Sequence, residues 1–384
     1  MGNKPLNILL INYDWRDIYR EKFYELEEKL ERDRLNPKSN NFFIFSWAHQ
    51  SYFLKSNNRF ATRHQKIVGP FFKPLYDFLA LFFVPYQVKK NNFKPDIITT
   101  YDFGSLPAAW LVSKFSGGRV IMTINNMPRV YSATRSFGGL KSIYSYLLEK
   151  LFYRLPEFYF TINQAMKDYL VSIGIPAEWV KLFSMNTIKR DWQYLQAAQA
   201  GVIRQKYGLK PEEKIIITVA RLEAEKDYPR MLRAFSRLDK TFHFISLGRG
   251  SLLPELKKLA AELGVSERVH FAGFVERDEI WNYYRDADVF MLLSRAEALG
   301  VVFWEAMYMN VPAIGSTAEG IIESIGRNNE RGFVWQAGET DEKIKKDIDF
   351  CLTPSEQRTA MLERAKQYVE AQIANDTTIN DIVS

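Results

Sequence analysis

Two glutamates, Glu297 and Glu305, are separated by seven intervening residues where a short apolar run gives way to a helical pattern. The run DADVFMLL (286–293) has the composition of a buried strand, and VVFWEAMYM (301–309) has the apolar spacing of a core-facing helix. In a parallel α/β sheet, the carboxyl end of a strand and the next helix N-terminus face the ligand crevice, where backbone N–H groups suit a diphosphate. Gly300 lets the backbone approach a ligand closely. The spacing therefore predicts a site for a phosphorylated ligand.

Two cations precede this pair in a similar setting. The segment KIIITVARLEAEKDYPRMLRAF begins with a predicted strand at 215–220 and ends in an amphipathic helix, with Arg221 and Lys226 in the turn between. Such cations could neutralise a leaving diphosphate, a task that a metal would otherwise perform. The chain has no convincing D-x-D motif and no His/Cys ligand cluster, so we expect no metal and no other cofactor. The bland alternative is a solvated surface pair.

The segment Glu297-x2-Gly300-x4-Glu305, followed by Ala306 and Met307, resembles the donor-binding signature of retaining GT-B glycosyltransferases of family 4. The resemblance implies that Glu297 contacts hydroxyls of the donor sugar and that Glu305 binds the ribose of the nucleotide. It places Leu299, Gly300 and Val301 in the donor-binding segment. Arg221 and Lys226 resemble the diphosphate-binding pair of the family. The implied catalytic residues are Arg221, Lys226 and Glu297.

Two weaker matches follow the same order. FHFISLGRGSLLPELKKLA is predicted as strand, Gly-rich turn and helix, and gives Gly248 as a donor-binding candidate, although such glycines also serve in ordinary tight turns. RVHFAGFV resembles the family strand that ends near the nucleotide base, which gives Phe274. In GSTAEGIIESI, Glu319 stands where the family has the first of two glycines, while Gly320 keeps the second. Because only glycine takes positive φ without strain, the geometry of that loop is in question.

The alternation of elements predicts an α/β protein with two domains. Expected strands at 7–13, 42–47, 96–101, 119–124 and 158–163 alternate with helical stretches, and a second series runs from 214 to about 334. The resemblance implies a GT-B fold, with two Rossmann-like domains facing a cleft. We expect an acceptor-binding domain over 1–200, a nucleotide-sugar domain over 201–360 and a helix over 361–384 that returns to the first domain.

The first half departs from the family pattern. Family members commonly have a Gly-rich loop after the first strand and a His after the fourth, where this chain has NYDWRDIYREKF and INNMPR. Asp14, Asp102 and Asn125 follow predicted strands and are the candidates for the acceptor side. Each has an alternative role as a helix cap or turn residue.

Charge is shared unevenly along the chain. Residues 1–200 hold 27 Lys and Arg against 16 Asp and Glu, and residues 51–150 hold 14 against 4, interleaved with aromatic residues. This pattern fits a surface that lies on anionic lipid, and the longest uncharged piece, 78–88, is too short to span a bilayer. The open alternative is that the aromatic residues form a core with a solubilising rim of lysines. No nucleic-acid-binding module is recognisable, so we expect no nucleic-acid partner.

These observations predict a metal-independent retaining glycosyltransferase that moves a sugar from a nucleotide-diphosphate sugar to a lipid-linked or other glycan acceptor, in cell-envelope polysaccharide synthesis. The single cysteine and the absence of a signal peptide favour a cytoplasmic enzyme, peripheral on the inner face of the membrane. The main alternative is a non-catalytic relative that binds a nucleotide sugar as a partner or scaffold protein. A GT-B phosphorylase or epimerase is a third, but no pyridoxal-phosphate lysine motif is visible.

Overall fold

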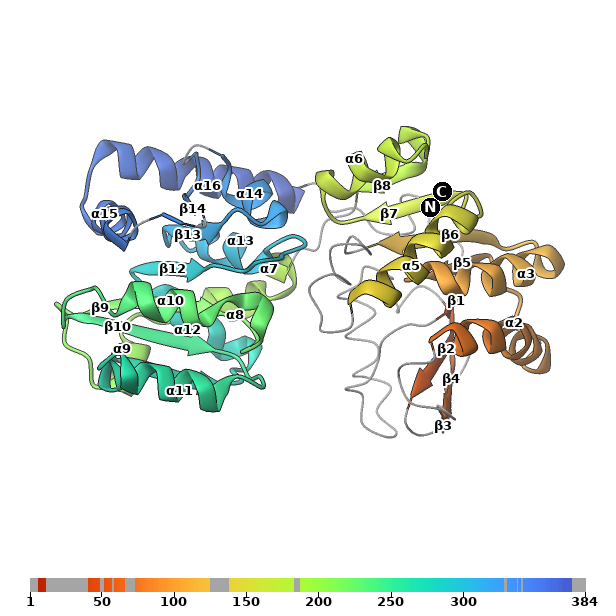
Figure 1. Cartoon of the computed structure of the whole chain (residues 1–384), viewed down its shortest axis with the longest axis horizontal. Coiled ribbons are helices and arrows are strands. Elements are labelled where there is room, and N and C mark those ends of the chain that lie inside the picture. Colours follow the sequence, from red (N-terminus) through yellow and green to blue (C-terminus); the bar gives the residue numbers. More distant parts are fainter. Residues whose placement is uncertain are drawn as a thin grey trace. The chain divides into compact units, whose positions relative to one another are not determined.

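The chain folds into two compact units, each built around a sheet that is packed against helices (Figure 1). The computed structural model describes residues 6–11, 41–48, 52–56, 59–65, 73–124, 138–182, 187–327, 330–336, 338–339 and 341–374. The first unit extends to Met185, and the second begins at Asn186. The expected α/β class is confirmed.

In its described part, the first unit has an eight-stranded sheet of order β3-β4-β2-β1-β5-β6-β7-β8. Its strands are β1 (Asn7–Ile11), β2 (Asn41–Ala48), β3 (Tyr52–Ser56), β4 (Arg59–Gln65), β5 (Ile97–Thr100), β6 (Arg119–Ile124), β7 (Phe158–Thr161) and β8 (Val180–Leu182). Its described helices are α2 (Lys73–Lys90), the short 3-10 helix η1 (Phe103–Ser105), α3 (Leu106–Ser116), α5 (Gly138–Phe152), α6 (Gln164–Ser172) and the 3-10 helix η2 (Ala177–Trp179). The inner strands β1, β5 and β6 are buried on both faces and consist mainly of apolar residues, with buried threonines in β5 and β6, as is typical of covered parallel strands.

Strands β3 and β4 were not expected from the sequence. They pair with each other antiparallel, and β4 extends the sheet by pairing parallel to β2. The segment YFLKSNNRFATRHQ has no continuous apolar run, because charged residues interrupt it, which is typical of strands at the edge of a sheet.

Helices α2, α3 and α5 cover the same face of this sheet. Each connects a strand to a later strand further along the sheet in the same direction, and right-handed crossovers of that kind place their helices on one face. Helix α2 packs against α3, and η1 contacts both α2 and α5. The core beneath them includes Ala80, Val84 and Val88 of α2 and Leu106 and Val112 of α3.

The second unit has a six-stranded parallel sheet of order β11-β10-β9-β12-β13-β14. Its strands are β9 (Lys214–Val219), β10 (Phe242–Leu247), β11 (Val269–Gly273), β12 (Val289–Leu292), β13 (Ala313–Ser316) and β14 (Phe333–Trp335). Its helices include α8 (Trp192–Ala197), α9 (Val202–Tyr207), the 3-10 helix η3 (Ala224–Lys226), α10 (Tyr228–Phe235), α11 (Leu253–Glu262), α12 (Arg277–Asp286), α13 (Val301–Tyr308), α14 (Glu319–Ile325), α15 (Asp341–Leu352) and α16 (Glu356–Ala374).

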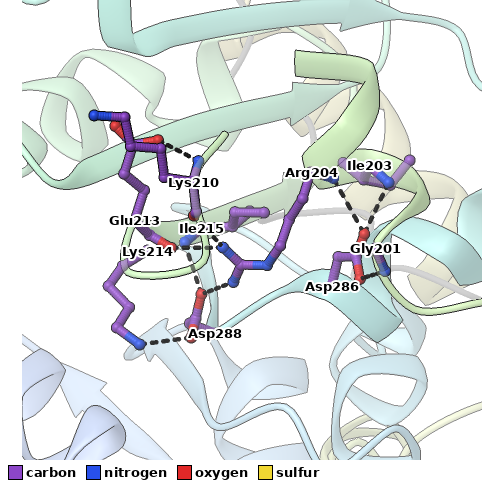
Figure 2. A network of polar contacts seen from close by, with 9 residues as sticks. All are labelled: Gly201, Ile203, Arg204, Lys210, Glu213, Lys214, Ile215, Asp286 and Asp288. Carbon is purple, nitrogen blue, oxygen red and sulfur yellow. Dashed lines mark hydrogen bonds and ion pairs between the residues drawn. The ribbon is translucent and has the colours of Figure 1, made fainter. Parts of the chain in front are cut away.

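The second unit begins earlier than the expected boundary near residue 200, because α8 and α9 pack on α12. The Asp286 carboxylate accepts hydrogen bonds from the N–H groups of Gly201 (2.6 Å) and Ile203 (2.8 Å) at the start of α9, as Figure 2 shows. Asp288 accepts from Arg204 Nη2 at 2.8 Å and from the Ile215 N–H at 2.9 Å. The Asp-Ala-Asp run at 286–288 therefore ties α9 to the sheet.

The terminal helix α16 packs within the second unit. It contacts α13, where the rings of Trp304 and Tyr368 lie 6.2 Å apart edge to face, and Ala365 and Val369 are buried. Because α16 begins at Glu356, it starts earlier than the expected residue 361. Its return to the first domain stays a prediction, because residues 375–384 lie outside the described ranges.

Candidate active site

The strand order of the second unit creates one point where successive connections diverge. From β9 the chain adds β10 and β11 on one side, and then returns to place β12 on the other side of β9. In open α/β sheets, ligands bind outside the carboxyl ends of the strands at such a switch point. The loop after β9 carries Arg221 and Lys226, and the loop after β12 carries Glu297. The topology alone therefore brings the predicted residues to one edge.

Lys226 and Glu297 meet at this switch point. Lys226 Nζ lies 2.6 Å from Glu297 Oε2, and both side chains are largely buried. The Ser294 hydroxyl donates to the same oxygen at 3.4 Å. A largely buried cation beside a carboxylate places a phosphate-binding group within reach of a group that can accept from sugar hydroxyls. Lys226 and Glu297 belong to two separate motifs that the sequence predicted for the site, and the structure brings them into contact.

Arg221 lies on the exposed side of the same loop. Its Nη2 pairs with Glu225 Oε1 at 2.6 Å, and its side chain is well exposed. Exposed ion pairs four residues apart stabilise a protein by only about 0.3–0.5 kcal/mol, so Arg221 can exchange Glu225 for an anionic ligand at little cost. The structure therefore leaves the guanidinium available without placing it in contact with Lys226 or Glu297.

A second ion pair joins the same two loops and was missed by the sequence analysis. Asp227, directly after Lys226, has φ of 50° and accepts from Arg295 Nε and Nη2, each at 3.2 Å. The hydrogen bonds and charge of Asp227 raise the pKa of Arg295. The signal was the occurrence of a second charge of opposite sign in each loop. This pair fixes the loop geometry around Lys226 and Glu297.

Gly248 allows the loop after β10 to pack on the loop that carries Arg221. A Cβ at Gly248, where φ is +146°, would lie 2.0 Å from the Ala220 carbonyl oxygen, and one at Gly250 would lie 2.3 Å from the Leu222 carbonyl oxygen. The N–H of Gly248 donates to the Gly273 carbonyl oxygen at 2.7 Å. The Gly-x-Gly motif therefore has a packing role. This role is compatible with the predicted role of Gly248 in donor binding.

Phe274 follows β11 at the same edge of the sheet and is exposed. The guanidinium of Arg249 lies 5.6 Å from the centre of its ring. The sequence named Phe274 as a neighbour of the nucleotide base, and it did not name Arg249, which only the turn geometry brings alongside. An exposed aromatic ring with a cation over it offers a flat surface for a base.

Glu305 is far more buried than a carboxylate that is free to bind a ribose would be. Its side chain is 1% exposed, its Oε2 accepts from the Tyr284 hydroxyl at 2.8 Å and its Oε1 accepts from Arg277 Nη2 at 2.9 Å. Arg277 also pairs with Asp191, whose side chain is 2% exposed. The predicted ribose contact therefore requires the nucleotide to share or displace one of these partners.

The charges in this network shift the neighbouring pKa values. Burial, together with the charge of Glu305, raises the pKa of Tyr284 well above its usual range. Burial tends to lower the pKa of Arg277, but the charges of Glu305 and Asp191 outweigh burial and raise it. Both groups keep their protons throughout the physiological range, so they act as fixed donors that hold Glu305.

The segment between the two glutamates is shaped by backbone contacts. Gly300 has φ of +66° at the start of α13, and the buried Leu299 offers its carbonyl oxygen to Ser324 Oγ at 2.7 Å. Val301 is the first residue of α13 and is half-buried. Leu299 can therefore meet a ligand only through its backbone.

Glu319, which stands where the family has the first of two glycines, does not disturb the site. Among the described non-glycine residues, positive φ occurs only at Asn92, Asp227 and Asn310, so Glu319 adopts ordinary backbone geometry. A Cβ at Gly320 would lie 2.6 Å from the Glu297 carbonyl oxygen, and the Gly320 N–H donates to that oxygen at 3.1 Å. The retained glycine is thus the one that contacts the Glu297 loop.

Of the three acceptor-side candidates in the first unit, only Asp102 lies within the described residues. Asp102 caps η1, because its carboxylate accepts from the Ser105 N–H at 3.0 Å and from Ser105 Oγ at 3.2 Å. This is the capping role that the sequence left open. Asp14 and Asn125 lie outside the described residues. Within the described ranges, no group of three or more His, Cys, Asp or Glu side chains could hold a metal ion.

Comparisons with known proteins match each half of the chain to a family. Residues 42–184 match the family described as Glycosyltransferase Family 4, and residues 200–368 match Glycosyl transferases group 1. An uncharacterized glycosyltransferase of Methanocaldococcus jannaschii is 27% identical over 58% of this chain and 58% of its own length. A sulfoquinovosyl transferase of Arabidopsis thaliana is 25% identical over 75% of this chain and 54% of its own length. An alpha-monoglucosyldiacylglycerol synthase of Acholeplasma laidlawii is 33% identical over 30% of each chain.

Solved structures share the fold over nearly the whole chain. A sucrose-phosphate synthase from Thermosynechococcus elongatus gives a TM-score of 0.74 at 16% identity over 98% of this chain and 96% of its own. HepE of Anabaena, in complex with UDP and glucose, gives 0.69 at 15% identity over 97% and 96%. The matched part of this chain spans 58% and 54% of the lengths of the first two relatives. With one family matched in each unit and a shared two-unit fold, the chain belongs to the GT-B glycosyltransferases of the family 4 type.

Proposed function

We propose that the protein transfers a sugar from a nucleotide-diphosphate sugar to an acceptor hydroxyl with retention of configuration and without a metal ion. The observation that carries this proposal is the 2.6 Å contact between Lys226 Nζ and Glu297 Oε2 at the switch point of the second unit. A leaving diphosphate needs a cation, and a transferred sugar needs an acceptor of its hydroxyl protons. The pair supplies both groups from two loops that the sheet topology brings together.

In the proposed reaction, the bond between the anomeric carbon and the diphosphate oxygen breaks, and a bond from the acceptor oxygen to that carbon forms on the same face. The acceptor proton passes to the leaving diphosphate, so no protein base is required. Lys226 and Arg221 stabilise the negative charge that develops on the diphosphate. Glu297 orients the sugar through its hydroxyls. Glu305 holds the ribose, and the nucleotide replaces one of its present donors.

The acceptor is proposed to be a lipid-linked glycan or glycolipid, bound by the first unit at the surface of an anionic membrane on its cytoplasmic side. The proposal is supported by the names of the sulfoquinovosyl transferase and the alpha-monoglucosyldiacylglycerol synthase, of which the second denotes a glycolipid product. It is also supported by the cationic excess of residues 51–150. A role in cell-envelope polysaccharide synthesis is part of the same proposal.

A panel of nucleotide sugars, screened first by thermal shift and then by product formation, tests the reaction. A bound donor stabilises the fold by mass action, by about 2.7 kcal/mol at a concentration of 100 times Kd. Lys226→Ala should reduce the shift and abolish turnover. Lys258→Ala is the matched control, because Lys258 pairs with Glu262 on the exposed surface of α11 in the same unit. Full activity in a folded Lys226→Ala variant would remove this residue from the mechanism.

A second candidate function is supported by the enclosure of Glu305. If Arg277 and Tyr284 do not release this carboxylate, the chain is a relative that binds a nucleotide sugar weakly and serves as a partner or scaffold protein. One experiment distinguishes the two functions. A thermal shift with every donor tested but no product, with lipid or soluble acceptors, would favour the scaffold.

A further inference from the structure

Helix α2 is apolar on the side that faces away from the core as well as on the side that packs. Its inner side includes Ala80 and Val84, which are fully buried. On its outer side, Phe78, Phe82 and Tyr86 follow one another at four-residue spacing and are 56%, 61% and 57% exposed. A surface helix of a globular protein ordinarily carries polar residues on its outer side. The sequence left open whether these aromatic residues form a core, and the structure shows that this row does not.

The two neighbouring helices continue the same apolar surface. Helix α3 exposes Trp110 and Phe115. Helix α5 exposes Ile143, Leu147 and Leu151, again at four-residue spacing, and Leu151 is 70% exposed. Because α2, α3 and α5 cover one face of the sheet, these rows together form what we call the outer helical face. Single exposed apolar residues are ordinary on proteins, but contiguous rows of this size mark an interaction site.

The acidic residues of these three helices are withdrawn from that face. Asp77 of α2 is buried and accepts from the Tyr144 hydroxyl of α5 at 2.7 Å, which also joins the two helices. Glu149 of α5 is buried and accepts from the Tyr169 hydroxyl at 2.5 Å. No other Asp or Glu occurs in the sequences of α2, α3 and α5. Neither carboxylate therefore offsets the lysines of these helices at the surface.

Lysines border the exposed aromatic rings. Lys89 Nζ lies 4.7 Å from the centre of the Phe115 ring, and Lys114 Nζ lies 5.1 Å from that of Trp110. Lys90 and Lys150 make similar contacts with aromatic rings on their own helices. An apolar face bordered by lysines matches the two layers of an anionic bilayer surface, with acyl chains beneath negatively charged headgroups.

We propose that the outer helical face of α2, α3 and α5 docks on the surface of a bilayer that contains anionic lipid. The aromatic and leucine side chains enter the headgroup boundary, while Lys89, Lys90, Lys114 and Lys150 contact lipid phosphates. No helix within the described ranges is long and apolar enough to cross a membrane. A second copy of the chain fits this face less well, because a two-fold contact would set lysines against lysines. The inference specifies the membrane surface of the proposed function and does not depend on donor binding.

Flotation of the full chain with vesicles tests the proposal. Neutral phosphatidylcholine vesicles are compared with vesicles that also contain phosphatidylglycerol, at low and high salt. We expect binding to the anionic vesicles at low salt, falling as salt rises. Each lysine near such a surface contributes roughly fivefold to partitioning. Lys89→Glu with Lys90→Glu should therefore weaken binding by well over tenfold.

The matched control reverses the same two charges elsewhere. Lys257→Glu with Lys258→Glu changes two exposed neighbouring lysines on α11 of the second unit, and should leave vesicle binding within about twofold of the parent. Phe78→Ser with Phe82→Ser tests the apolar contribution and should weaken binding by roughly tenfold or more. Thermal unfolding and nucleoside diphosphate binding of each variant show whether the fold and the donor site are intact.

The outcomes separate this proposal from its alternatives. No binding to anionic vesicles at low salt, or equal losses in the α2 and α11 charge variants, would overturn it. A dimer in sedimentation velocity without lipid that is lost in the Phe78→Ser, Phe82→Ser variant would make a second copy the occupant. Vesicle binding that persists in a chain that binds no nucleotide sugar would uphold this proposal while the proposed transfer activity fails.

Discussion

Replacing Arg277 by Met should destabilise the second unit more than any comparable surface change. Arg277, the first residue of α12, holds the carboxylates of Glu305 and Asp191, which are 1% and 2% exposed. Removing one member of a buried ion pair costs about 3–5 kcal/mol, because the remaining charge is left without a partner. Arg277 itself is 36% exposed, so water can replace part of its contact. We therefore expect a loss of about 3 kcal/mol, at the low end of that range.

The size of this effect is measurable in the unfolding of the second unit. For a domain of about 150–250 residues, each kcal/mol lowers Tm by roughly 2–4 °C, so the transition should fall by about 6–12 °C. Tryptophan fluorescence can monitor the surroundings of Arg277, because its guanidinium lies 5.8 Å from the ring centre of Trp281. Arg285→Met, an exposed arginine on the same helix, is the control and should change stability by about 0.5 kcal/mol at most.

A double variant tests the physical cause. Glu305→Gln keeps an acceptor for the Tyr284 hydroxyl but removes the buried charge, so Arg277→Met combined with Glu305→Gln should recover about half of the loss. A single variant within 1 kcal/mol of the parent would refute the assignment of Arg277 as the partner of both carboxylates. Equal instability of the single and double variants would show that lost packing, not the orphaned charge, is responsible.

Three further outcomes are expected. Glu297→Ala should leave the fold intact and lower kcat by about 100-fold or more, measured by product formation at saturating donor, because its partner in the transition state is a sugar hydroxyl; an active, folded variant would contradict this. Lys226→Ala and Arg221→Ala should weaken binding of the free nucleoside diphosphate by calorimetry, about tenfold to 100-fold for the more buried Lys226, and activity should persist in EDTA; recovery only with a divalent ion would contradict the metal-free mechanism. Gly248→Ala should cost about 3 kcal/mol in urea unfolding, because the new Cβ would overlap the Ala220 carbonyl, whereas Gly264→Ala, where φ is +67° in open space, should cost about 1 kcal/mol; equal costs would mean that backbone conformation alone explains the glycine.

The sequence predicted the parts of the site that depend on local pattern. A strand followed by a charged turn placed Lys226 and Glu297 at the ends of β9 and β12, and parallel strands present such turns at a common edge. Their 2.6 Å contact could not be read from the sequence, because it depends on β12 pairing with β9 rather than with β11. The α/β alternation was sufficient for the fold class, but the polar β3–β4 hairpin gave no apolar signal.

Side-chain contacts between residues far apart in the chain could not be predicted from the sequence. Nothing local to Glu305 indicates that Arg277 and Tyr284, on another helix, occupy its carboxylate. The exposed row on α2 could not be separated from its buried row, because both sides of the helix are apolar and only the packing partner differs. In the same way, the charge pattern at Asp286 and Asp288 does not reveal that both carboxylates bind the segment around α9.

The strand order of the second unit also has a consequence for the stage of folding at which the nucleotide site forms. Strands β9, β10 and β11 are neighbours in both sequence and space, whereas β12 must return past them to pair with β9. Lys226 and Glu297 are 71 residues apart in the chain, so their contact closes a long loop. Loop closure of this kind is slow relative to local pairing. We expect the nucleotide site to appear late in folding, and nucleoside diphosphate binding during refolding to report that final docking step.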